Sequence, residues 1–460
     1  MIVMKFGGTS VEDAVSMKNV ATIVQQEIHQ QPIVVLSACS GTTNQLLRIA
    51  QLASQRNKEE ALQHVASVEG RHKKIVSDLF DKDSAKPLHR YITTQIEELA
   101  ALVNGIVIVG ELTPRSLDIF ASYGERLSSS IFYEYLKSQN ISSALVDART
   151  FMVTDENFTK AAPLFSEIEK KMYDIISPEL QKNKIVVTQG FIGATKNGVT
   201  TTIGRGGSDY SAAIIGALLN AKDIQIWTDV DGILTAAPNI VKNAKKIKVM
   251  SFNEAAELAY FGAKVLHPET ILPAVNKNIP VRVLNSKRPE STGTLIVAKP
   301  STKQQCIIKS IAYKEGITII SIVSSRMFLA HGFLENIFDV FHKYQTVVHT
   351  VVTSEVSVSV SIDNSTHLSE IVKELQKFST VTVNDKKAIV CVTGEHIKST
   401  PGIAAKVMNS LADININMIS QGASEITIGL VIDEINVQEA VQRLHIEFFS
   451  DVSQLTEIFE

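Results

Sequence analysis

The chain opens with one pattern written twice, and this repetition restricts the folds open to it. Residues 2–6 form a short apolar run that ends in Gly7 and Gly8, and apolar residues at helical spacing come next. Residues 32–36 form a second β-rich run, which leads through a small, polar segment at 37–44 into another helical stretch. Strand, turn and helix in repeated order predict a layered α/β domain built on a mostly parallel sheet.

More of the chain continues this alternation. The segment 54–102 has mainly helical spacing and a polar face. Further β-rich runs lie at 106–109, 143–146, 185–188 and 224–227. We predict strands at all four, and a domain boundary between about residue 295 and residue 301.

The last third of the chain has short β-rich runs with few helices. The runs are at 317–323, 346–352, 355–362, 388–393 and 425–432, with helices predicted at 333–344 and 402–412. Gly332 precedes Ser354 by the same number of residues as Gly402 precedes Ser424, and each serine is followed by Glu and alternating β-branched residues. The pattern favours two tandem β-α-β units over a chance match of spacing.

Composition excludes several classes of protein. Lys plus Arg is 45 and Asp plus Glu is 48, so the net charge of −3 gives no general support for nucleic-acid or polybasic membrane binding. The three cysteines, Cys39, Cys306 and Cys391, are scattered, which argues against a disulfide scaffold or a cysteine zinc site. No apolar run approaches the roughly 18 residues of a membrane span, and no signal-peptide layout is present. We expect a cytoplasmic protein that binds no membrane.

The segment Lys5-Phe-Gly-Gly-Thr-Ser lies between the first predicted strand and helix. Glycines allow the backbone to approach an anion, a helix N-terminus attracts it, and Lys5 adds a point charge suited to phosphate. Ser10, with Asp13 three residues later, is the predicted cap of the helix. The alternative is an ordinary glycine turn with a solvated lysine, and the Walker A pattern is absent.

A second glycine-rich segment, Thr-Thr-Ile-Gly-Arg-Gly-Gly-Ser-Asp-Tyr at 201–210, precedes an apolar helix. Arg205 is suited to a bidentate pair with a carboxylate. Asp209 would repel a phosphate, so we interpret it as an organiser of a lysine or a metal. Ser208 or Asp209 is expected to cap the helix. The alternative is a capped helix with a surface arginine.

Other polar residues follow predicted strands or begin predicted helices. Thr43 follows the second strand, where open α/β sheets bind ligands, and is expected to converge with Lys5. Glu125 is expected near a helix start, where a glutamate commonly only complements the helix dipole. Thr228 and Asp229 end a strand, and the alternative to a binding role is an Asp-Gly turn, which is common.

Taken together, these segments resemble the aspartokinases of the amino-acid-kinase family, most closely the monofunctional, lysine-sensitive branch. The matching motifs are KFGGTS at 5–10, TTIGRGGSDY at 201–210, WTDVDGI at 227–233, FGAKVLHP at 261–268 and TSEVSVSV at 353–360. The resemblance implies an amino-acid-kinase three-layer sandwich over 1–295. It also implies two ferredoxin-like ACT domains, at 301–385 (regulatory) and 386–460.

The resemblance also implies the reaction. The γ-phosphoryl group of ATP would pass to the side-chain carboxylate of L-aspartate, giving 4-phospho-L-aspartate, the first step toward lysine, threonine and methionine. A carboxylate is already a nucleophile, so positioning and charge stabilisation suffice without a general base. Mg²⁺ would be held mainly by the phosphates, with no protein metal ligands. Feedback by an amino acid, lysine first, and a homodimer or higher homo-oligomer through the ACT domains are implied as well.

The roles implied at matching positions are these. Catalysis falls to Lys5 and Asp209, and aspartate binding to Thr43, Glu125, Arg205 and Ser208. The nucleotide would contact Gly7, Gly8, Thr9, Ser10, Thr228, Asp229, Leu234 and Lys264. The effector would contact Met327, Gly332, Phe333, Leu334, Val348, Ser354 and Glu355.

Three positions depart from the family pattern. Leu234 stands where many members have tyrosine, and Asn239 where they have arginine, which bears on ATP affinity. His349 stands where an acidic residue is common in the effector pocket, which disfavours contact with an amino group and leaves open an effector other than lysine or weak inhibition. Two alternatives follow: a catalytically weak amino-acid sensor, or a kinase for glutamate, acetylglutamate or UMP.

Overall fold

The computed structural model describes the chain except for residues 261–267, 301–306, 325–331 and 452–454. The chain forms two compact units. The first comprises Met1–Ile233 and Val265–Pro300, and the second comprises Leu234–Lys264 and Ser301–Glu460. Residues 234–264 therefore group with the C-terminal part of the chain, although the sequence-based boundary of 295 places them in the N-terminal domain.

The sheet of the first unit is mostly parallel, as expected. Its strands lie in the order β3 (Ser143–Val146), β5 (Ile185–Gln189), β2 (Ile33–Leu36), β1 (Val3–Phe6), β8 (Ile224–Thr228), β10 (Val281–Asn285) and β11 (Thr294–Val297). Only β11 runs antiparallel to its neighbour within this set. Because parallel strands bring their carboxyl ends to one edge, the segments after β1, β2, β5 and β8 meet there.

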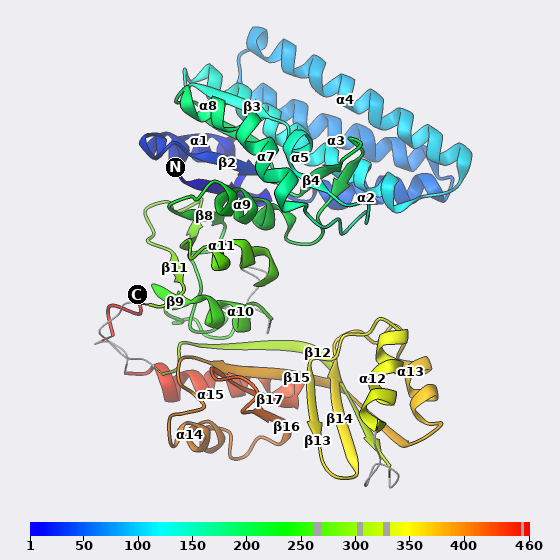
Figure 1. The fold of residues 1–460 in the computed structure, drawn as a ribbon, viewed down its shortest axis with the longest axis vertical. Coiled ribbons are helices and arrows are strands. Elements are labelled where there is room, and N and C mark those ends of the chain that lie inside the picture. Colours follow the sequence, from blue (N-terminus) through cyan, green and yellow to red (C-terminus); the bar gives the residue numbers. More distant parts are fainter. Residues whose placement is uncertain (261–267, 301–306, 325–331, 452–454) are drawn as a thin grey trace. The chain divides into compact units, whose positions relative to one another are not determined.

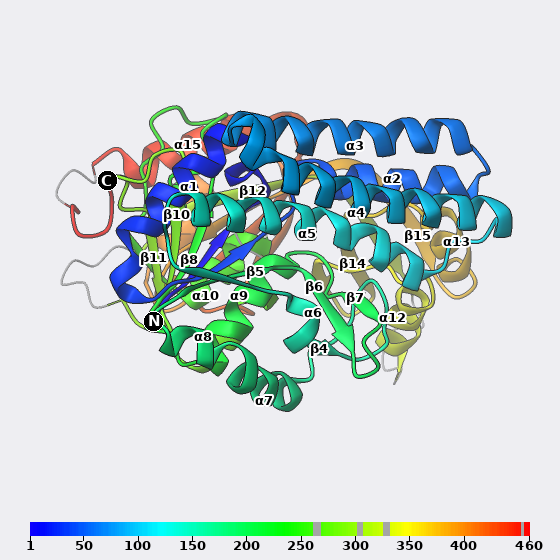
Figure 2. The ribbon, with the colours of Figure 1, turned by 90° about the horizontal axis from the view of Figure 1, so that it is seen from above.

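Long helices cover one face of this sheet. They are α1 (Ala14–Gln26), α2 (Thr42–Ser54), α3 (Lys58–Leu79), α4 (Lys82–Val109) and α5 (Pro114–Ser138). Figure 2 shows α2 to α5 side by side, in agreement with their mutual packing. Met4 and Phe6 point from β1 into the hydrophobic core that these helices share, so the alternate residue Lys5 points to the other face.

The opposite face of the sheet carries α9 (Gly207–Leu218), which packs on β1, β2 and β8. Also in this unit are α6 (Ala148–Phe151), α7 (Phe165–Ile175), α8 (Ser177–Gln181) and α11 (Leu272–Asn276), with 3-10 turns at Gly8–Ser10, Ile28–Gln30 and Pro268–Ile271. A small sheet of β4 (Val153–Thr154), β6 (Ile192–Thr195) and β7 (Thr200–Thr202) leads into α9.

The strand predicted at 106–109 is wrong, because these residues are the last turn of α4. Ile106 and Val107 pack against the helical core, and Gly110, with φ 73°, ends the helix. Tertiary packing has overridden the β preference of this run. By length and composition alone α4 is the one described helix fit to cross a membrane, which is weak evidence because core helices pass the same test.

The second unit contains one antiparallel sheet (Figure 1). Its order is β13 (Thr350–Thr353), β14 (Ser357–Ile362), β12 (Ser310–Val323), β15 (Thr380–Thr393), β17 (Thr427–Asp433) and β16 (Ile416–Gln421). Its helices are α10 (Phe252–Tyr260), α12 (Phe333–Lys343), α13 (Leu368–Leu375), α14 (Ile403–Ser410) and α15 (Val437–Phe449), and the strand β9 (Val249–Ser251) precedes α10. A 3-10 turn, Glu434–Asn436, precedes α15.

Two strands of fourteen residues run through both halves of this sheet. The first half of β12 pairs with the end of β15, and the second half of β12 pairs with its beginning. β14 adds to one half of β12, and β17 adds to the far half of β15. The two repeats are therefore interleaved, and the predicted boundary at 385–386 falls inside β15.

The glycines of the internal repeat have equivalent places in the structure. Gly332 is the N-cap of α12 with φ 79°, and Gly402 is the N-cap of α14 with φ 85°. This left-handed conformation is costly for residues with a Cβ atom, which explains a glycine at both positions. The two halves thus begin their first helix in the same way, as the spacing of the repeat predicted.

Candidate active site

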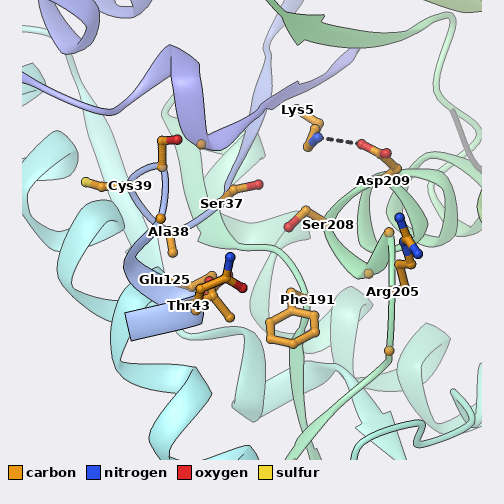
Figure 3. A pocket seen from close by; sticks show the side chains of 17 residues that line it. Lys5, Ser37, Ala38, Cys39, Thr43, Glu125, Phe191, Arg205, Ser208 and Asp209 are labelled. Atoms are coloured by element: carbon orange, nitrogen blue, oxygen red, sulfur yellow. Dashed lines mark ion pairs between the residues drawn. The ribbon is translucent and has the colours of Figure 1, made fainter. Parts of the chain in front are cut away.

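Lys5 and Asp209 form an ion pair between the sheet and α9. Their Nζ and Oδ1 atoms lie 2.6 Å apart, and both side chains are nearly buried. Lys5 reaches this position because it alternates with core residues on β1 and so faces α9. Asp209 is in the first turn of α9, where a carboxylate is favoured by the helix dipole. Asp209 is thus paired with a lysine, and this lysine is Lys5 (Figure 3).

The predicted helix caps differ from the structure at both glycine-rich segments. Gly206, with φ 72°, is the N-cap of α9, so Ser208 and Asp209 lie within its first turn. Asp13 is the N-cap of α1 and accepts from the Ser16 amide at 2.8 Å. Ser10 is buried instead in the turn Gly8–Ser10, with its Oγ 2.7 Å from that of Ser286. The motifs do not determine at which residue each helix begins, so they do not determine which residue becomes the cap.

Glu125 lies in the middle of α5 and not at a helix start, so the dipole interpretation is wrong. Its side chain is buried, and its Oε2 atom has no partner within the described residues. Burial raises the pKa of Glu125 to about 8, although the Ala38 amide, which donates to the carboxyl group, opposes this shift. Gly124 allows this placement, since a Cβ atom there would lie 2.6 Å from that of Ala38.

Close contact between two loops shapes the rest of the site. The Ser40 amide donates to the Gly8 carbonyl at 3.1 Å, and a Cβ atom on Gly8 would lie 2.8 Å from the Ala38 carbonyl oxygen. Arg71 of α3 donates to the backbone carbonyls of Ser40 and Glu12, at 2.5 and 3.0 Å. Sequence reasoning missed Arg71, because an arginine inside a polar helix carries no signal of contact with distant loops.

These segments enclose one cavity of about 370 Å³. Its lining includes all six residues predicted for catalysis and aspartate binding, together with Gly8, which was predicted at the nucleotide: Lys5, Gly8, Thr43, Glu125, Arg205, Ser208 and Asp209. The others are Ser37, Ala38, Cys39, Ser40, Gly41, Asn44, Phe191, Gly204, Gly206 and Gly207. Figure 3 shows Lys5 and Asp209 on one side and Glu125 and Thr43 on the other, with Ser208 between them. A cation and a carboxyl group thus face one polar space.

The residues predicted at the nucleotide are only partly assembled around this cavity. Gly7, Thr9, Ser10, Thr228 and Asp229 are not in its lining. They lie at the same sheet edge, because the Gly7 amide donates at 3.0 Å to the carbonyl of the last core residue of β8, Trp227.

Two further positions of interest for the nucleotide lie in the second unit. Leu234 and Asn239 belong to the second unit, where the Ser310 hydroxyl donates to the Leu234 carbonyl and the Asn239 amide donates to the Tyr313 hydroxyl at 3.2 Å. Lys264 lies outside the described residues. Their roles at the nucleotide remain predictions.

The predicted effector residues lie in one half of the second unit, apart from Met327, which is outside the described residues. Gly332 caps α12, Phe333 is in the hydrophobic core of that half, and Val348 packs against the same core. Leu334 is exposed on α12. Ser354 and Glu355 are exposed in the turn between β13 and β14.

His349 is engaged within the second unit. Its Nε2 lies 2.9 Å from Asp363 Oδ1, and its Nδ1 lies 2.8 Å from the Tyr260 hydroxyl. Lys314 Nζ lies 2.7 Å from the other oxygen of Asp363. Burial raises the pKa of Asp363, but bonds from Lys314 and His349 outweigh it, so the net shift is downward. An ionised carboxylate therefore adjoins the histidine that replaces the acidic residue of the family pattern.

Comparisons with known proteins agree with this architecture. Residues 1–285 match the amino acid kinase family, and residues 390–448 match the ACT domain. The lysine-sensitive aspartokinase 3 of Escherichia coli is 34% identical over 462 residues, which cover 98% of this chain and 99% of that protein. The chain belongs to the aspartokinases. Its reaction is accordingly the phosphorylation of the side-chain carboxylate of aspartate.

Other aspartokinases support the assignment over the whole chain. The chloroplastic aspartokinase 1 of Arabidopsis thaliana is 37% identical over 98% of this chain and 81% of its own length. The structure of E. coli aspartokinase III in complex with aspartate and ADP matches with a TM-score of 0.85 and 33% identity, covering 98% of this chain and all of that one. The predicted amino-acid-kinase fold with C-terminal ACT domains is confirmed.

Proposed function

We propose that the cavity between Lys5 and Glu125 binds L-aspartate together with the terminal phosphoryl group of ATP. Arg205 would pair with the α-carboxylate of aspartate, and Glu125 would accept its α-ammonium. Thr43 and Ser208 would complete the pocket with hydroxyl groups. The observation that carries this proposal is that the Lys5–Asp209 ion pair and the buried Glu125 open onto one space.

Lys5 and Asp209 serve the transfer step in this proposal. An oxygen of the aspartate side chain forms the new bond to the γ-phosphorus as the bond from phosphorus to the bridging oxygen breaks and ADP leaves. Negative charge on the transferred group would be stabilised by Lys5, which Asp209 holds in place. No proton has to be removed from the nucleophile, so charge stabilisation and positioning account for catalysis.

Mg²⁺ would arrive with the nucleotide and be held mainly by its phosphates, where it neutralises charge. The residues of the cavity fit this arrangement. Its two carboxyl groups are those of Asp209, which is paired with Lys5, and Glu125, whose raised pKa favours the neutral form. The described residues contain no cluster of three ligating side chains of the His, Cys, Asp or Glu type. The nucleotide would extend past Gly7, Thr9, Ser10, Thr228 and Asp229.

Regulation would be by an amino acid at the predicted effector residues of the ACT half, and we propose lysine. A structure of E. coli aspartokinase III contains lysine and aspartate and matches this chain with a TM-score of 0.82. His349 does not remove acidity from the region, since the ionised Asp363 is bonded to it. Asp363 is therefore a candidate partner for an effector ammonium in place of the usual acidic residue.

We also propose a homodimer or higher homo-oligomer formed through the ACT region. β13 is an edge strand of its sheet and carries the exposed residues Val351 and Val352, near the exposed Val347 and Val356. Unpaired backbone groups beside apolar side chains favour pairing with a second chain. We place the enzyme in the cytoplasm at the first step toward lysine, threonine and methionine.

The test is a hydroxamate-coupled assay with ATP, Mg²⁺ and L-aspartate, with and without lysine. Turnover that lysine suppresses supports the reaction and the effector together. Turnover that lysine leaves unchanged keeps the reaction and overturns lysine as effector. Absence of turnover at millimolar ATP would favour the alternative of a catalytically weak sensor. Light scattering after size-exclusion chromatography tests the oligomer, and a monomer at assay concentration would contradict it.

A further inference from the structure

Asp118 is a buried carboxylate that the proposed reaction does not use. It lies on α5, is 1% exposed, and precedes Glu125 on the same helix by seven residues. Residues seven apart lie on the same side of an α-helix, two turns from each other. No salt bridge to Asp118 is present in the described part of the chain, so its burial has to be supported by hydrogen bonds.

The carboxylate of Asp118 joins two segments that are distant in sequence. Its Oδ1 accepts from the Thr202 hydroxyl at 2.6 Å, and its Oδ2 accepts from the Thr202 amide at 3.0 Å. The Thr159 amide donates to the same carboxylate, at 3.1 and 3.0 Å. Thr159 has φ 72°, which is unfavourable for a threonine, so its loop is held by contacts of this kind.

Thr202 is the last residue of β7 and leads directly to Arg205. The amide of the next residue, Ile203, donates to the Phe191 carbonyl at 3.0 Å, and Phe191 lines the cavity. Gly204, with φ 81°, then turns the chain, and a Cβ atom there would lie 3.6 Å from the Thr159 carbonyl oxygen. The bonds to Asp118 therefore fix the strand end from which the turn to Arg205 begins, and the Thr159 loop that lies against this turn.

We propose that Asp118 is a positioning residue that sets the location of Arg205 relative to Glu125. The α-carboxylate and the α-ammonium of aspartate would then be bound by Arg205 and Glu125, and α5 would fix the distance between these two side chains. Glu125 is carried by α5 itself, and the loop of Arg205 is tied to α5 through Thr202. This inference rests on the roles proposed above for Arg205 and Glu125. A small displacement of Arg205 would weaken aspartate binding strongly, even though Arg205 would still line the cavity.

The pattern of hydrogen bonds explains why position 118 carries a carboxylate, which accepts hydrogen bonds and donates none. All of the groups facing Asp118 are able to donate, and two of them are backbone amides. A side-chain amide can replace it in part: its oxygen can accept from both backbone amides, and its nitrogen can donate to the Thr202 hydroxyl. Alanine would leave the amides without partners and free the turn from α5.

The test compares kinetics of Asp118→Ala, Asp118→Asn and Thr202→Val in the full-length enzyme. For Asp118→Ala we expect the KM for aspartate to rise at least tenfold and the KM for ATP to change less than twofold. We expect Asp118→Asn to recover to within about threefold of the wild type. Thr202→Val should raise the KM for aspartate by an intermediate factor, because it removes only the hydroxyl donor. Asp174→Ala, at an exposed aspartate on α7, is the matched control and should change neither constant.

The outcomes separate this inference from the one on which it depends. An unchanged KM for aspartate in folded Asp118→Ala, or equal changes in both KM values with a lower melting temperature, overturns the positioning role. If Asp118→Ala does not fold, Thr202→Val decides, and an unchanged KM for aspartate in that variant overturns the role as well. An Arg205→Ala enzyme with a normal KM for aspartate refutes the assignment of Arg205 instead.

Discussion

The buried Glu125 predicts that the affinity for aspartate depends on pH. Burial raises the pKa of Glu125 to about 8, so at pH 7 about one tenth of the free enzyme carries the ionised form. If the α-ammonium of aspartate binds only to the ionised form, the apparent dissociation constant at pH 7 is about tenfold above its limit at high pH. The KM for aspartate should therefore fall about tenfold per pH unit from pH 6 to 7, and level off above pH 8.

The assay measures the KM for aspartate between pH 6 and 8.5 at saturating ATP and Mg²⁺. Calorimetry in two buffers of different ionisation enthalpy provides an independent count of protons, with about 0.9 released per aspartate bound at pH 7. Glu125→Gln cannot ionise, so its KM should be raised and should not vary over this range. A wild-type KM that is flat between pH 6 and 8, or no proton release at pH 7, would refute the reasoning.

The same pKa gives a signed prediction for stability. Because the pKa is raised in the folded state, folding is penalised as soon as pH rises above the ordinary value of 4.5, and the penalty stops growing near pH 8. At pH 7 this corresponds to at most about 3.5 kcal/mol, at about 1.4 kcal/mol per pH unit above 4.5. Glu125→Gln should therefore unfold at higher urea concentration than the wild type. A less stable variant would show that Glu125 is ionised and satisfied in the fold.

Three further predictions concern other charged groups. Lys5→Ala should lower kcat at least a hundredfold with an unchanged far-ultraviolet circular dichroism spectrum, and near-normal kcat would reject its role. Arg71→Ala should raise the KM for aspartate and for ATP together, since two loops of the cavity lose a charged donor worth about 1.5–3 kcal/mol; a change in neither would contradict this. Glu254 and Lys309 form a buried ion pair at 3.0 Å in the second unit. Glu254→Ala should lower the free energy of unfolding by about 3–5 kcal/mol in urea titrations, and a loss below about 1 kcal/mol would show that Glu395, whose Oε1 lies 3.8 Å from Lys309 Nζ, compensates the charge.

The sequence was sufficient for the parts of the site that follow strands. Lys5 and Thr43 were predicted at the carboxyl edge of a parallel sheet, because glycines and small polar residues directly follow β-rich runs. Glu125, Asp118 and Arg71 lie inside long helices. The helical period shows only which face of a helix is buried. It does not show that α5 passes the loop at Ala38, because this depends on how the helices pack.

Prediction of individual elements and boundaries failed where long-range pairing decides. The run at 106–109 has the composition of a strand, but it continues α4 since its neighbours in space are helices. The resemblance places a boundary at 385–386, and the repeat does identify equivalent glycines. Local spacing does not show that β15 continues unbroken from one half into the other, because this depends on its pairing along β12.

The continuity of β12 and β15 limits how the regulatory part of this enzyme can be rearranged, by evolution or by design. A domain whose two ends lie in loops can be exchanged by joining the chain at those two loops. Here β12 and β15 each contribute residues to both halves of the sheet. A crossover between residues 380 and 393 would join two sequences within β15, and their pairing registers need not match. A shift of one residue in register turns core side chains to the opposite face of the sheet. Transplanting a new effector specificity therefore requires moving both ACT halves together, or substituting residues singly within them.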